Sequence, residues 1–140
     1  MTDDRRRETQ QSAAAVELNH TIVYAKDRQR SAEFIAAILG LEVGAPFGPF
    51  LPVELGNGVT LDYYEMNDQP IQSQHYAFLV PDAQFDAMIA RLEAAGVTYY
   101  ADPSHAEPGR VNDLFGGRGA YFDDPDRHNM EIMTRPYARS

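Results

Sequence analysis

The chain has 140 residues and a formal net charge of −9 at pH 7, with 44% hydrophobic and 24% charged residues, which is ordinary for one globular domain. The acidic balance argues against nucleic acid as a partner, and no run reaches the 18 apolar residues of a membrane span. The absence of cysteine excludes disulfides and thiolate ligands and is typical of a cytoplasmic protein. Residues 1–15 are polar and include Arg5–Arg7, so we expect a disordered tail there and a single domain over 16–140.

The first half of the domain, about residues 16–68, has one helical pattern between strand-like runs. Residues 18–24 are rich in branched and aromatic side chains and predict a strand. A helix is predicted next, with Asp27 as its N-cap and Gly40 as its end. Asn57-Gly58 then predicts a hairpin between two further strands. This half is therefore predicted as β-α-β-β, and an additional strand within 43–51 is left open.

The second half, about residues 72–136, repeats that order. A strand is predicted over 73–80 and a helix over 85–96. Three short strands follow at 97–100, 119–122 and 129–134, with a long loop from 101 to 118. At an offset of 55 residues His20 falls on His75, and Asp27 falls on Asp82, another candidate N-cap. The two halves are therefore predicted to be copies of one module.

Strand alternation places polar residues on one face of the predicted sheets. Glu131 alternates with Met130 and Ile132, so it is expected on the face opposite the core. The same alternation sets Asp62 and His75 on the face away from the helices, and His20 opens the first strand. Because an isolated buried charge costs several kcal/mol, imidazoles and carboxylates on one face are typical of a divalent metal site.

These features resemble the vicinal oxygen chelate superfamily, through the duplicated module, the histidine in each opening strand, and D-P-D followed by M-E-I. This superfamily includes glyoxalase I, fosfomycin-resistance enzymes, extradiol dioxygenases and bleomycin-resistance proteins. The resemblance covers about residues 16–136 and implies an α+β fold. Two tandem βαβββ modules would form a cup-shaped mixed β-sheet with helices on its outer face. It also implies a homodimer, with each site completed within one chain or across two.

The resemblance further implies a metal site made by His20, His75 and Glu131. One divalent ion (Fe, Ni, Co, Zn or Mn) would bind there and chelate adjacent oxygens of a small-molecule substrate. Asp62 stands about where glyoxalase I has a fourth ligand, and it is equally a catalytic base or a polar cavity residue. Asp62 or Glu131 would move a proton, and both are our candidate catalytic residues.

Three functions remain open from the sequence. A glyoxalase-like lyase or isomerase is preferred, a single-domain extradiol-type iron(II) dioxygenase is second, and a metal-free protein that sequesters an aromatic antibiotic is third. Tyr64, His105 and Tyr121 are candidate substrate-binding residues, although tyrosines in sheets often only pack. The loop that carries His105 is long enough to act as a lid, or it is an ordinary loop.

Overall fold

The computed structural model describes residues 15–139, so most of the predicted tail, residues 1–15, lies outside the described residues. Over the described part, the elements in chain order are β1 (His20–Ala25), α2 (Arg28–Leu39), β2 (Phe50–Glu54), β3 (Thr60–Glu65), β4 (His75–Leu79), α3 (Asp82–Ala94), β5 (Tyr99–Tyr100), the 3-10 helix η1 (Leu114–Gly116), β6 (Gly119–Asp123) and β7 (Asn129–Met133). The chain is thus α+β, as the sequence predicts. None of the helices in this part of the chain is long and apolar enough to cross a membrane.

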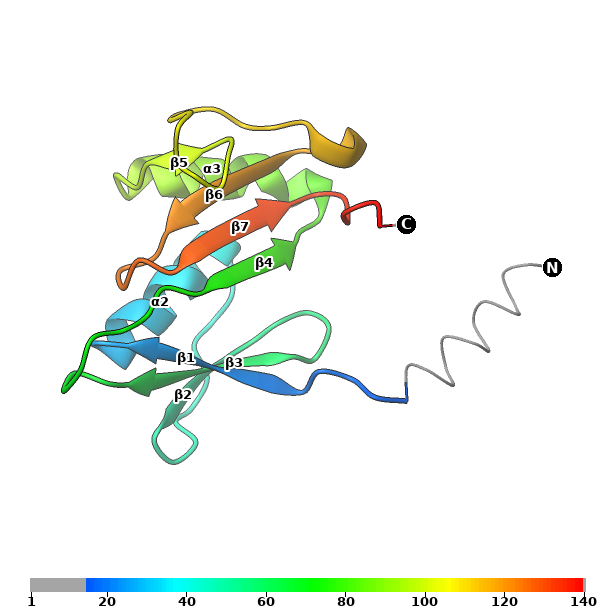
Figure 1. The fold of residues 1–140 in the computed structure, drawn as a ribbon. Helices are drawn as coiled ribbons and strands as arrows, with labels where there is room; N and C mark the ends of the chain where they lie inside the picture. Colours follow the sequence, from blue (N-terminus) through cyan, green and yellow to red (C-terminus); the bar gives the residue numbers. More distant parts are fainter. Residues whose placement is uncertain (1–14, 140) are drawn as a thin grey trace.

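The strands form two sheets, one in each module (Figure 1). The first sheet has the order β1-β3-β2, and the second has the order β4-β7-β6-β5. In both modules the opening strand pairs in parallel with the last strand, and that last strand pairs antiparallel with the strand before it. The predicted duplication is confirmed by this shared topology. The segment 43–51 makes an isolated bridge from Val43 to Val53 in place of an additional strand.

Of the two predicted helix caps, the first is confirmed and the second is wrong. Asp27 is the N-cap of α2, because its side chain accepts a hydrogen bond from the Arg30 amide at 3.1 Å. The prediction that Asp82 caps α3 is wrong: the cap residue is Pro81, and the Asp82 carboxylate accepts from Arg118 instead. The Asn57-Gly58 hairpin is confirmed, although its connection spans residues 55–59.

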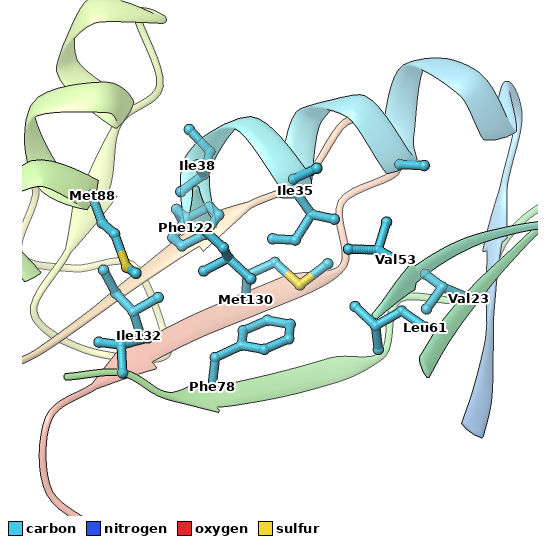
Figure 2. Close-up of a cluster of buried hydrophobic side chains, with 14 of the residues drawn as sticks. Val23, Ile35, Ile38, Val53, Leu61, Phe78, Met88, Phe122, Met130 and Ile132 are labelled. Carbon is cyan, nitrogen blue, oxygen red and sulfur yellow. The ribbon is translucent and has the colours of Figure 1, made fainter. Parts of the chain in front are cut away.

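A single hydrophobic core joins the two modules (Figure 2). Ile35 and Ile38 of α2 lie beside Phe122 and Met130 of the second sheet, while Val53 of the first sheet completes the same cluster. All of these side chains are buried. Burial of each large apolar side chain contributes on the order of 2 kcal/mol, so the core holds the two sheets in a fixed relation.

The opposite face of each sheet carries the polar residues that alternation predicts. Met130 and Ile132 are fully buried in the core, and Glu131 lies between them on the other face. His75 and Leu79 are exposed on that same face of β4, where Leu79 is 58% exposed. This face of the second sheet, rather than its helix-covered face, is therefore the accessible one.

Candidate metal centre

His75 and Glu131 meet on the open face of the second sheet. His75 opens β4, which pairs in parallel with β7 so that Ala77 lies opposite Glu131. The offset of two residues brings the His75 Nε2 atom to 3.1 Å from the Glu131 Oε1 atom. Two residues 56 positions apart in the sequence thus form one pair.

The contact of the other ring nitrogen of His75 determines which nitrogen carries the proton in the neutral ring. His75 Nδ1 lies 2.8 Å from the backbone oxygen of Asn129. Because a carbonyl oxygen only accepts hydrogen bonds, Nδ1 carries a proton, and in the neutral ring Nε2 presents its lone pair to Glu131. A metal-binding histidine is held by the same kind of bond from its second nitrogen.

The residues present fit a divalent cation. Two acceptor atoms that face each other at 3.1 Å repel unless a proton or a metal cation lies between them. Two ligand atoms, each about 2.1 Å from one cation and at a right angle, are about 3 Å apart. An imidazole nitrogen with a carboxylate oxygen is also the donor set that zinc, iron, manganese and nickel accept.

Glu131 is deeply buried for a carboxylate, at 1% exposed. Its second oxygen, Oε2, accepts a hydrogen bond from the Tyr137 hydroxyl at 2.7 Å. The Tyr121 hydroxyl lies 3.0 Å from that of Tyr137, and the Tyr121 ring stacks on His75. Burial raises the pKa of Tyr121, and the Tyr137 hydrogen bond and the Glu131 charge raise it further. Burial likewise raises the pKa of Tyr137, so both phenols keep their protons at neutral pH.

His105 joins this side of the second sheet from the 101–118 loop. Its ring stacks on Tyr100 with centroids 4.1 Å apart, and its Nε2 lies 3.1 Å from the Asn129 side-chain oxygen. The Asp102 carboxylate accepts the amides of Ala106 and Glu107, which shapes the loop around His105. His105 adopts φ +62°, a left-handed conformation that is rare for a histidine.

The first module places His20, Asp62 and Tyr64 on its own sheet. His20 pairs with Thr60, and Ile22 pairs with Asp62, so His20 and Asp62 repeat the two-residue offset of His75 and Glu131. Tyr64 packs edge-on against Tyr24 with centroids 6.0 Å apart. Within residues 15–139, no three His, Cys, Asp or Glu side chains form a group that could hold a metal ion.

The sequence-predicted residues are therefore divided between the two sheets. His75, Glu131, His105 and Tyr121 come together on the second sheet, while His20, Asp62 and Tyr64 lie on the first. Sequence reasoning missed Tyr137, which lies beyond the last strand and carries no periodic signal. It placed Asn129 on the Glu131 face by alternation but gave it no role.

Comparison with known proteins identifies relatives of the whole domain. The family model described as Glyoxalase/Bleomycin resistance protein/Dioxygenase superfamily matches residues 17–132. The glutathione transferase FosA of Serratia marcescens is 32% identical over 120 residues, which cover 82% of this chain and 78% of that protein.

Two solved structures are more similar in sequence. Oxidase ChaP-H2 is 57% identical with a TM-score of 0.86, and the match covers 88% of this chain and 96% of that one. Oxidase ChaP-H1 is 52% identical with a TM-score of 0.85, and the match covers 89% of this chain and 99% of that one. At these identities the amino-acid sequences, and not only the folds, are similar.

Proposed function

Because the chain belongs to the Glyoxalase/Bleomycin resistance protein/Dioxygenase superfamily, we propose that it is a metal-dependent enzyme that oxidises a small substrate bearing adjacent oxygens. Dioxygen would be the oxidant. The observation that carries the proposal is the His75–Glu131 pair, in which an imidazole nitrogen and a carboxylate oxygen lie 3.1 Å apart, as two ligands of one cation would. When bound, a divalent cation there would act as a Lewis acid toward two adjacent substrate oxygens.

The third ligand in this proposal is His20 from a second copy of the chain. A site of two histidines and one carboxylate leaves positions open for substrate, which suits iron(II). Within residues 15–139, one chain brings together only two of these three side chains. A homodimer in which the open face of the first sheet meets the open face of the second would supply His20, with Asp62 and Tyr64 beside it.

The remaining side chains have roles that follow from their chemistry. Asp62 would accept or return a substrate proton, since a carboxylate at the rim of such a site is a suitable general base. Tyr121 and His105 would border the substrate on the second sheet, and Tyr64 would border it on the first. The 101–118 loop is shaped by Asp102 and bonded to Asn129, which favours a fixed wall over a lid.

Oxidation is favoured over the lyase or isomerase chemistry that we preferred from the sequence. Two oxidases are more than half identical to this chain, whereas the 32% identical relative is named a glutathione transferase. Addition or isomerisation without an oxidant is therefore the second candidate. A metal-free sequestering protein is the third candidate, and in it a protonated His75 would donate a hydrogen bond to Glu131.

Elemental analysis of tag-free protein purified anaerobically tests the proposal. We expect about one first-row metal ion per chain, lost in His75→Ala and in Glu131→Ala but retained in His105→Ala as the matched control. Consumption of dioxygen by the iron-loaded protein with a panel of catechols would support oxidation. Proton exchange next to a carbonyl without oxygen uptake would move the assignment to the second candidate. Absence of metal in the wild type, even after these ions are added, would overturn the enzyme proposal.

A further inference from the structure

The segment that follows β7 reaches back to the candidate metal centre through Tyr137. This residue lies beyond residue 132, where the family model ends. Its hydroxyl is 2.7 Å from Glu131 Oε2, whereas His75 Nε2 faces Oε1. The two carboxylate oxygens therefore have different partners.

The hydrogen bonds around Tyr137 run in one direction. A carboxylate only accepts, so the Tyr137 hydroxyl donates its proton to Glu131. That hydroxyl then has only an acceptor site left, and the Tyr121 hydroxyl at 3.0 Å must donate to it. Tyr121 is 3% exposed and Glu131 1% exposed, so bulk water cannot readily replace either bond.

The Tyr137 ring is held by packing as well as by its hydroxyl. Phe115 lies with its ring centroid 4.8 Å from that of Tyr137. Phe115 has φ +56°, which is a strained conformation for a bulky residue. The segment that carries Phe115 and the segment that carries Tyr137 approach each other closely at Gly117. A Cβ atom at this position would lie 2.6 Å from the Arg135 side chain.

We propose that Tyr137 is a positioning residue that holds Glu131 with a single oxygen, Oε1, directed at the metal-binding position. A carboxylate free to rotate would offer both oxygens to a cation and occupy a position that substrate needs. The hydrogen bond to Oε2 prevents this rotation and makes the carboxylate a monodentate ligand that binds through Oε1. This inference rests on the proposed metal site, and partners of this kind change metal affinity by about 10–100-fold.

Tyr137→Phe tests the inference, because it removes the hydroxyl and keeps the ring on Phe115. Tyr99→Phe is the matched control, since the Tyr99 hydroxyl also donates to a carboxylate, Glu93, at 2.7 Å but outside the site. Metal-free protein is titrated with Co²⁺, and the affinity and visible spectrum are recorded. We expect the Co²⁺ affinity of Tyr137→Phe to fall about 10-fold or more, with an altered spectrum, while Tyr99→Phe matches the wild type. Wild-type affinity and spectrum in Tyr137→Phe would overturn the inference and leave the proposed function intact.

Crystal structures of metal-free wild type and Tyr137→Phe give a second readout that does not depend on the metal. We expect the Glu131 carboxylate to rotate or take two orientations in the variant and one in the wild type. If the wild type binds no Co²⁺, the proposed function fails, and these structures alone decide the inference. An unchanged Glu131 orientation in Tyr137→Phe would then overturn it.

Discussion

Asp62 and Glu131 occupy the same position in the two modules. Each lies in the last strand of its module, paired in register with the residue two places after the opening histidine. Glu131 is covered by Tyr121 and Tyr137, whereas Asp62 pairs with Ile22 and Pro52. One duplicated framework therefore provides two equivalent carboxylate positions with different surroundings, and the contact with a histidine is seen at Glu131.

Complementation between two inactive chains tests whether His20 acts across a dimer. We expect His20→Ala and Glu131→Gln each to lose metal as homodimers, because each removes one of the three ligands. In a heterodimer of the two variants, one of the two sites would receive His20 from the Glu131→Gln chain and an intact His75–Glu131 pair from the other. Co-expression with two affinity tags, followed by metal analysis, should therefore show metal at about half the wild-type content.

The control for that experiment pairs His75→Ala with Glu131→Gln. Both changes affect the second module, so each site of the heterodimer keeps one defect and no metal should bind. Restored metal in the control pair, or none in the His20 pair, would contradict a site completed by two chains.

Asp62→Asn separates a proton-transfer role from a ligand role. We expect metal content to stay within about twofold of the wild type and turnover to fall by about 10²–10⁴-fold, the usual contribution of a general base. Glu54→Gln is the control, because Glu54 is an exposed carboxylate that pairs with Thr60, two residues before Asp62 in β3. Loss of metal from Asp62→Asn would instead make Asp62 a fourth ligand.

The alternation of side chains was enough to predict which residues face the core. Met130 and Ile132 are buried among helices, and Glu131 lies opposite, because a strand exposes its faces with a period of two whatever surrounds it. The repeat offset also identified His20 and His75 as equivalent, and both open a strand in the structure. These features depend on local geometry that the sequence carries directly.

Contacts between distant segments could not be predicted in the same way. Tyr137 reaches Glu131 from an irregular segment, so no periodicity connects the two residues. The Asn129 backbone oxygen orients His75. Because every residue type has a backbone oxygen, the sequence gives no signal for this contact. The division of the predicted ligands between two sheets depends on how the modules pack, which alternation within single strands does not specify.

Gly117→Ala should displace Tyr137 without changing any residue that contacts Glu131. A Cβ atom at Gly117 would lie 2.6 Å from Arg135 Cγ and 2.8 Å from Thr134 Oγ1, so the segment leading to Tyr137 must shift. Overpacking of this kind costs about 1–3 kcal/mol. Urea unfolding should show that loss, and the Co²⁺ affinity should fall as in Tyr137→Phe. Gly56→Ala is the control, since a Cβ atom there meets nothing within 4 Å, and equal behaviour of the two variants would refute the link.

Asp124, in the turn before β7, has a buried carboxylate that should make the stability of the protein depend on pH. The carboxylate is buried, and its Oδ1 atom accepts the amides of Asp126 at 2.9 Å and His128 at 2.8 Å. Its Oδ2 atom is also buried and accepts no hydrogen bond from the described residues. Burial raises the pKa of Asp124 to about 6, although the hydrogen bonds from the His128 and Asp126 amides act to lower it.

The pH dependence follows from the direction of that shift. A carboxyl group whose pKa is higher in the folded state than in the unfolded chain binds its proton more tightly when folded, so its contribution to stability falls as pH rises. The loss begins near the unfolded value of 3.8 and is complete above the folded value of about 6. Asp124→Asn keeps the Oδ1 acceptor and removes the charge. The variant should therefore match the wild type near pH 4 and exceed its free energy of unfolding by on the order of 2 to 3 kcal/mol at pH 7.

Urea unfolding at pH 4, 5, 6 and 7, at one protein concentration, measures this difference directly. The fixed concentration matters because dimerisation would otherwise shift the apparent stability. Asp123→Asn serves as the control: its side chain is 47% exposed, so solvent screens its charge and the variant should differ little from the wild type at any pH. A difference between Asp124→Asn and the wild type that stays constant from pH 4 to pH 7 would mean that the charged form of Asp124 is no less favourable in the folded turn than in the unfolded chain.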